Sequence, residues 1–127
     1  KGSVVNLERS IKASTEIGGH LMSGHIHFTG KVLKTSYKDS TADIVIKFPV
    51  KFKEYIFEKG YIGLNGCSLT LGKVNKDSFY IHLIPETLSV TNLKNLKKDC
   101  LVNIEIDQNT IAIVETVKKT LASKKSR

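Results

Sequence analysis

The chain has 127 residues, of which 40% are hydrophobic and 25% charged, and its formal net charge at pH 7 is +8. This length and composition predict one globular domain with a modest core, and no apolar run approaches the roughly 20 residues of a membrane-spanning helix. Of its 20 basic residues only Arg9 and Arg127 are arginine, and no basic cluster is interleaved with aromatic residues. Because phosphate and base recognition favour arginine, we expect a solvated lysine-rich surface and no nucleic-acid interface.

The chain has two cysteines, without CxxC spacing, and nothing at its start resembles a signal peptide. Reduced thiols are typical of proteins of the cytosol, and secretion would need a leader. We therefore expect a cytoplasmic protein that is not associated with a membrane.

Apolar and β-branched residues predict strands over Ser3–Glu8, His25–Tyr37 and Ala42–Phe48. Gly30 interrupts the second of these strands and predicts a bulge or bend there. Pro49 ends the third strand, because proline cannot donate to a ladder.

The middle of the chain alternates between short helices and strands. The i, i+3, i+4 spacing of apolar residues predicts a helix over Val50–Glu58. β-structure resumes over Tyr61–Val74 with a turn at Asn65–Gly66, and a hairpin joins it to Phe79–Ile84. Pro85 then suits the first turn of another short helix.

The last predicted strand is Cys100–Asp107, and the last predicted helix is Asn109–Lys125. An apolar stripe runs along that helix and consists of Ile113, Val114, Val117 and Leu121. Such a stripe either docks on its own domain or forms a seam between copies in a symmetric oligomer.

The sequence repeats itself, because VVNLE at Val4–Glu8 returns as LVNIE at Leu101–Glu105. The separation of about 100 residues is the size of one small β-barrel, although short matches also arise by chance. We expect residues 1–17 to be the last strand and linker of an N-terminal barrel that the chain lacks. Residues 18–107 would be the second barrel, and residues 108–127 the C-terminal helix with its basic tail.

Three histidines, His20, His25 and His27, lie close together among glycines. HxH on a strand places both rings on one face, as in many metal sites, but structural zinc needs four ligands and the cysteines offer no supporting pattern. Glycine allows the backbone to approach a ligand closely, so a pocket for a planar heterocycle is the alternative. We expect His27 to be structural.

Ser68 and Thr70 alternate, so both hydroxyls face one side of a strand, where they hydrogen-bond a polar ring or face solvent. Cys67 faces the other side, and we expect it to be packed and not nucleophilic. Asp107 ends the last strand, where its carboxylate either orients an imidazole or caps the next helix.

Five motifs occur in the order VNLERSIK, EIGGHLMSGHI, EKGYIGLNGCSLTLG, HLIPETLSVTNL and VNIEID. Together they resemble the second half of the trimeric riboflavin synthase family, over Val4 to about Leu121. The resemblance implies an all-β fold: a six-stranded Greek-key β-barrel with short helices and a C-terminal α-helix, through which three subunits associate as a homotrimer. It implies no metal and no organic cofactor, so the metal hypothesis is dropped.

The resemblance also implies an activity. The family is a transferase that converts two molecules of 6,7-dimethyl-8-ribityllumazine to riboflavin and 5-amino-6-ribitylamino-uracil, the last step of riboflavin biosynthesis. Its active site forms between the first barrel of one subunit and the second barrel of the next. This chain would therefore carry the C-terminal half-site, bind lumazine or riboflavin, and be poorly active alone. A non-catalytic lumazine- or flavin-binding protein of the same fold is the alternative.

Site residues follow from the resemblance position by position. The positions implicated in activity are His20, His25, Ser68 and Asp107. The implied substrate contacts are Gly24, His25, Ile26, Lys59, Ser68, Leu69, Thr70, Leu83, Ile84, Pro85, Glu86, Thr87 and Leu88. Our hypothesis is that His25 shuttles protons and that Asp107 biases it.

Overall fold

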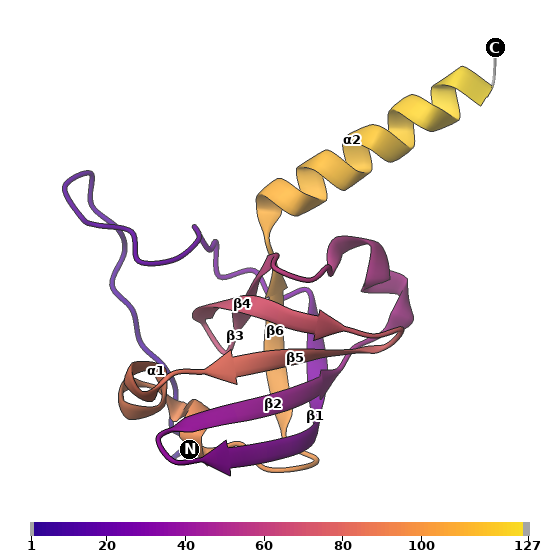
Figure 1. The fold of residues 1–127 in the computed structure, drawn as a ribbon. Coiled ribbons are helices and arrows are strands. Elements are labelled where there is room, and N and C mark those ends of the chain that lie inside the picture. Colours follow the sequence, from indigo (N-terminus) through magenta and orange to yellow (C-terminus); the bar gives the residue numbers. More distant parts are fainter. Residues whose placement is uncertain (1, 126–127) are drawn as a thin grey trace.

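The computed structural model describes residues 2–125, and a closed barrel of six strands forms its centre (Figure 1). The strands are β1 (Phe28–Lys38), β2 (Thr41–Lys47), β3 (Tyr61–Leu64), β4 (Cys67–Val74), β5 (Ser78–Leu83) and β6 (Leu101–Ile106). They are antiparallel in the order β1-β2-β5-β4-β3-β6. Since β6 returns beside β3 of the β3–β4–β5 meander, the order is that of a Greek key. The predicted fold class is confirmed.

The core consists of the inward-facing residues of all six strands. Its fully buried strand residues include Val32, Ile44, Ile46, Ile62, Leu64, Leu71, Phe79, Ile81, Leu83, Val102, Ile104 and Ile106. Burying one such side chain contributes about 1.5–3 kcal/mol. The alternation that fills the core also fixes which residues face outward, and the candidate site lies on that outer face.

The bulge of β1 does not lie at Gly30, so the prediction of a bulge at this residue is wrong. The register of β1 with β2 shifts between Val32 and Lys34, whereas Gly30 pairs regularly with Val102 of β6. A Cβ at Gly30 would lie 2.7 Å from Cγ2 of Ile46. The glycine therefore permits close packing against β2 and does not mark the bulge.

The strand predicted over Ser3–Glu8 is not formed. Every strand of the closed barrel already has two neighbours, so no strand offers a free edge along its whole length for this segment to join. Residues 2–18, which we call the arm, run outside the barrel with Val4, Val5 and Leu7 exposed (Figure 1). That this segment closes another barrel stays a prediction.

The short helices differ in length from the predictions. The helix expected over Val50–Glu58 is a 3₁₀ helix, η1 (Val50–Tyr55), and it ends before Ile56, which is buried with extended backbone. Helix α1 (Pro85–Val90) begins at the predicted proline, and a second 3₁₀ helix, η2 (Asn92–Asn95), follows. The β3–β4 turn is confirmed: Asn65 and Gly66 both have positive φ, as a two-residue hairpin of type I′ requires.

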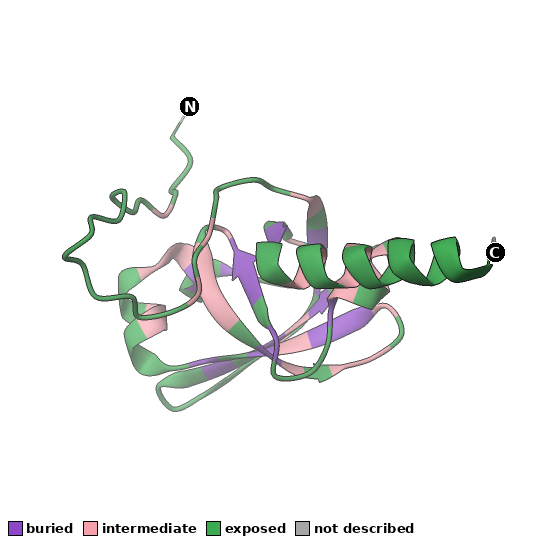
Figure 2. Ribbon diagram, turned by 90° about the horizontal axis from the view of Figure 1, so that it is seen from above, coloured by how far each residue is buried: buried purple, intermediate pink, exposed green. Residues whose placement is uncertain are grey.

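Helix α2 (Gln108–Lys125) projects from one end of the barrel (Figures 1 and 2). Ile113, Val117 and Leu121 of its apolar stripe are more than half exposed, so the stripe does not dock on its own barrel. The middle of α2 is tied to η1, because the Lys118 ammonium pairs with Glu54 and lies 5.0 Å from the centre of the Tyr55 ring. Between residues 2 and 125, no helix has the length and hydropathy to cross a membrane.

Candidate functional site

Residues 19–24, which we call the strap, lie over the outer face of β3, β4 and β6. The outward position of Ser68 on β4 receives the start of the strap, and Glu105 on β6 receives its end. Between them Met22 covers Gly63 of β3, where an added Cβ would lie 2.9 Å from the methionine Sδ. The strap is thus held at successive points by strands that are distant from it in the sequence.

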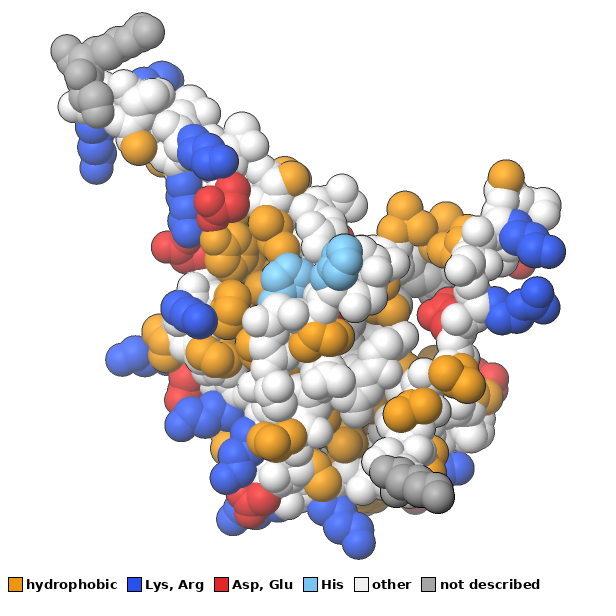
Figure 3. Space-filling model, turned by 180° about the vertical axis from the view of Figure 1, so that it is seen from behind, with side chains coloured by type: hydrophobic (Ala, Val, Ile, Leu, Met, Phe, Trp, Pro, Cys, Tyr) orange, Lys and Arg blue, Asp and Glu red, His pale blue; other side chains and the backbone are white. Residues whose placement is uncertain are grey.

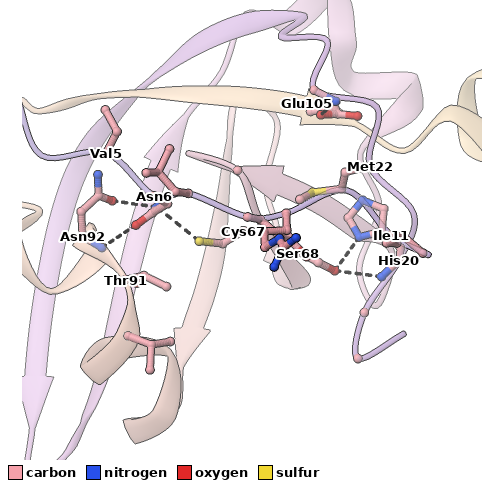
Figure 4. A pocket seen from close by; sticks show the side chains of 18 of the residues that line it. Val5, Asn6, Ile11, His20, Met22, Cys67, Ser68, Thr91, Asn92 and Glu105 are labelled. Atoms are coloured by element: carbon pink, nitrogen blue, oxygen red, sulfur yellow. Dashed lines mark hydrogen bonds between the residues drawn. The ribbon is translucent and has the colours of Figure 1, made fainter. Parts of the chain in front are cut away.

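His20 and Ser68 are brought into direct contact, 48 residues apart (Figure 4). The backbone N–H of His20 donates to Ser68 Oγ at 3.0 Å, and Nδ1 of the ring lies 2.6 Å from the same oxygen. The ring stacks on Tyr61, with centroids 5.2 Å apart. Since Ser68 Oγ accepts the backbone N–H, its own proton is free to be donated to Nδ1, a geometry suited to proton transfer.

Gly19 makes this contact sterically feasible. A Cβ at residue 19 would lie 2.4 Å from Ser68 Oγ and 2.7 Å from Ser68 Cβ. Rotation of the serine hydroxyl would leave the second overlap in place. The second glycine of the GGH motif therefore serves close approach to β4, whereas an added Cβ at Gly18 has nothing within 4 Å.

Glu105 holds the other end of the strap, and the sequence analysis did not select it. Its side chain is only 4% exposed. Oε1 accepts hydrogen bonds from the backbone N–H of Ser23 at 2.6 Å and from its hydroxyl at 2.9 Å, and Oε2 accepts from the N–H of Gly24 at 3.0 Å. An acidic residue between two isoleucines of a strand was the available signal.

Of the residues that follow the strap, some are exposed on the surface and one makes a hydrogen bond within the barrel. His25 and Ile26 are exposed. His27 is structural, as predicted: its Nδ1 accepts a hydrogen bond from the N–H of Ile106 at 3.1 Å. In the described part of the chain, no group of three or more His, Cys, Asp or Glu side chains is arranged to hold a metal ion.

Asp107 is buried and caps α2. Its Oδ2 accepts from the N–H of Thr110 at 3.0 Å and from its hydroxyl at 2.9 Å, and its Oδ1 accepts from the N–H of Asn109 at 3.4 Å. This is the capping alternative of the sequence analysis. Within residues 2–125 no hydrogen bond joins Asp107 to His25, so a catalytic role for Asp107 stays a prediction.

The β4–β5 ladder is open beside Ser68–Thr70. Its pairs are Leu71 with Ile81 and Val74 with Phe79, and in the described structure none joins residues 67–70 to β5. Leu71 N and O both bond on the β3 side, to Gly60 O and Lys59 N. Because backbone groups alternate along a strand, those of Ser68 point the other way, toward the opening.

The other predicted contacts do not all lie at this opening, because Lys59 bonds to Leu71 on the β3 side of β4. Lys59 is exposed, with φ of 68°, and its N–H bonds to β4 at Leu71 O over 3.0 Å. Thr70 is exposed, as a ring contact requires, whereas Leu69 is half-buried. In the following segment Leu83 belongs to the core, Thr87 and Leu88 are half-buried, and the exposed residues are Ile84, Pro85 and Glu86.

A cavity of 1020 Å³ lies between the arm, the start of β4 and the α1–η2 region (Figure 4). Of the predicted residues it is lined by His20, Gly24 and Ser68, and not by Lys59 or Thr70. Asn6 of the arm crosses it, and its side-chain amide donates to Asn65 O, Asn92 Oδ1 and Cys67 Sγ. Of the predicted site residues, the pocket thus brings together only His20, Gly24 and Ser68, and the others lie outside its lining.

Cys67 is not suited to be a nucleophile, in agreement with the sequence analysis. Burial raises the pKa of its thiol, and Glu8 nearby raises this pKa further. A raised pKa lowers the fraction of reactive thiolate at neutral pH.

On the face seen from behind, histidine side chains lie beside exposed hydrophobic side chains (Figure 3). Imidazoles and hydroxyls are therefore the groups available for chemistry here.

The fold is thus a small closed β-barrel of six strands with a strap over its outer face. Residues 23–107 match the family described as Lumazine binding domain. The chain therefore belongs to the lumazine-binding domain family.

Similar proteins agree with this membership. The chain is 47% identical to the riboflavin synthase of Escherichia coli (strain K12), over 98% of this chain and 59% of that protein. It is 43% identical to the riboflavin synthase of Chlamydia pneumoniae, over 94% and 58% respectively. The crystal structure of LumP complexed with 6,7-dimethyl-8-(1'-D-ribityl) lumazine superposes with a TM-score of 0.67 at 27% identity, over 71% of this chain and 51% of that one. The chain thus spans less than two thirds of the length of these relatives.

Proposed function

We propose that the chain is the C-terminal half of a riboflavin synthase and binds one 6,7-dimethyl-8-ribityllumazine. Its identity of 47% to the enzyme from Escherichia coli supports this, as does the lumazine complex of LumP. The structural observation that carries the proposal is the open β4–β5 ladder at Ser68–Thr70.

A flat pteridine suits this opening. Its ring edges carry donors and acceptors, and these can replace the cross-strand partners that the backbone of Ser68 lacks on the β5 side. The hydroxyls of Ser68 and Thr70 lie on the same outward face of β4 beside the opening and add polar contacts to the ring. Ile84 and Leu88, across the opening, supply apolar contact for the ring.

The chemistry assigned to the site is proton transfer with orientation. The reaction removes a proton from an acidic methyl group of one pteridine and adds a nucleophile or water to a ring carbon. Imidazole exchanges protons near neutral pH, and the contact between His20 Nδ1 and the Ser68 hydroxyl on β4 can pass a proton from one side chain to the other. His25, exposed after the strap, is free to contact the second substrate. Holding two rings face to face supplies much of the remaining rate.

The other half of the site belongs, in this proposal, to a barrel that precedes the chain. The relatives are longer, and this chain covers 59% of the enzyme from Escherichia coli. The exposed stripe of α2 supports association of three copies through that helix. A cytoplasmic location is part of the same proposal.

A titration followed by an assay tests the proposal. Riboflavin added to the chain should lose fluorescence on binding, and Thr70→Ala should weaken binding by roughly 2- to 12-fold, the effect of one hydrogen bond. Ser36→Ala, at an exposed position of β1, is the control for loss of an exposed hydroxyl. Turnover of 6,7-dimethyl-8-ribityllumazine should appear only when the first barrel is supplied. Binding without turnover would instead favour the non-catalytic binding protein, and absence of binding would refute both.

A further inference from the structure

We propose that Glu105 is a positioning residue: its carboxylate fixes the strap on the barrel and thereby sets the positions of His20 and His25. The inference rests on the proposed function, because the residues it positions are those assigned to the lumazine. It adds to that function a residue outside the expected contact set.

The carboxylate is built into its place. Glu105 lies on the outer face of β6, paired with Gly63 of β3, and is 4% exposed. A buried carboxylate is strongly unfavourable unless donors surround it. Its three donors are the N–H and hydroxyl of Ser23 and the N–H of Gly24, so all of them come from the strap.

The barrel does not need this arrangement for its own closure. The inward positions of β6 on either side, Ile104 and Ile106, supply its share of the core, and the strand pairs with β1 and β3 by backbone. Glu105 faces outward, and every side-chain bond it makes in the described structure is to the strap. Its side chain therefore acts on the strap and contributes little to closing the barrel.

The effect on the histidines is direct. His25 follows Gly24, whose φ of 80° sets the chain direction at the point where its N–H meets Glu105. His20 lies at the opposite end of the same short segment, against Ser68. Without the carboxylate, the strap would lose its hold next to His25, and only its contacts at Gly63 and Ser68 would remain to hold His20.

A graded series of variants tests the proposal. Ser23→Ala removes one hydrogen bond, Glu105→Gln replaces the acceptor at Gly24 with an amide group, and Glu105→Ala removes all three. Glu58→Gln, at an exposed glutamate, is the control for loss of charge. Amide hydrogen exchange at Ser23 and Gly24 should accelerate least in Ser23→Ala, more in Glu105→Gln and most in Glu105→Ala, where we expect at least about tenfold. The exchange rates of the six barrel strands should not change.

Riboflavin affinity provides the functional measurement. It should fall in the same order, by about tenfold or more in Glu105→Ala, at a temperature where every variant is fully folded. Unchanged exchange at Ser23 and Gly24 would overturn the claim that Glu105 fixes the strap on the barrel. Accelerated exchange with wild-type affinity would overturn the positioning role. If the wild type binds no riboflavin, the proposed function fails and the positioning role fails with it. The exchange data still test whether Glu105 fixes the strap on the barrel. Glu105→Gln serves if Glu105→Ala does not fold.

Discussion

Gly19→Ala should detach the start of the strap while the barrel stays folded. The added Cβ would overlap Ser68, at 2.4 Å from Oγ and 2.7 Å from Cβ. Because the Cβ of a strand residue moves only with its backbone, the strap and not β4 must give way. Gly18→Ala is the matched control, since nothing lies within 4 Å of its Cβ and its φ is not in the left-handed region.

The magnitude follows from the contacts that would be lost. These are two hydrogen bonds between His20 and Ser68, of about 1 kcal/mol each, and the stack of His20 on Tyr61, worth about 0.5–1.5 kcal/mol. The sum of about 2.5–3.5 kcal/mol shifts the balance between docked and detached strap by roughly 60- to 300-fold. The melting temperature should change little, because none of these residues belongs to the core.

Amide hydrogen exchange of residues 19–24 measures the detachment, and riboflavin titration measures its effect on the site. Gly19→Ala should show fast exchange at His20 and weaker binding, and Gly18→Ala should match the wild type in both. If the two alanine variants behave alike, close approach of the strap to Ser68 is not what Gly19 provides, and the reasoning fails.

Three further predictions concern Asp107, α2 and His25. Asp107→Ala should lower the helical circular dichroism of α2 and destabilise it by about 1 kcal/mol, whereas Asp107→Ser should restore the cap; loss of turnover in a capped Asp107→Ser protein would show that the carboxylate also acts in the chemistry. The Tyr55 hydroxyl, which donates to Glu115, lowers the pKa of that carboxyl. Since the pKa of Glu115 in the folded state lies below its unfolded value, this contact stabilises the attachment of α2 fully at pH values above the ordinary pKa of glutamate. The stabilisation is lost as the pH falls through the lowered folded-state pKa. Carboxyl NMR titration should show the pKa of Glu115 rising in Tyr55→Phe, and an unchanged pKa would contradict this. In the protein with both barrels, His25→Ala should reduce turnover far more than lumazine affinity, and equal losses would count against proton transfer by His25.

Alternation predicted the strands well wherever a partner strand exists. Ala42–Phe48 was expected and Thr41–Lys47 is observed, and the Asn65–Gly66 turn is where the sequence places it. VVNLE and LVNIE show the limit, because Leu101–Ile106 is a barrel strand and Val4–Glu8 is not. Nearly identical local sequences take different structures, since a strand is stabilised by its neighbours more than by its own propensity.

For the candidate site, the sequence predicts a set of residues, which stays a prediction, but not their geometry. The resemblance named both His20 and Ser68, yet nothing local to either residue indicates that they touch. Glu105 was missed because an acidic residue on the outer side of a strand ordinarily faces water. Its burial depends on the strap, 81 residues away at Gly24, folding back over β6.

Under the proposed association through α2, the exposed end of this helix links helix formation to assembly. Beyond Lys118 every described residue of the helix is exposed, and a free helix of this length is only marginally stable in water. Dilution of the protein should therefore melt the last turns, and contact with further copies should order them. The helical content of the chain would then report its concentration, so that subunit association and the final step of folding become one equilibrium.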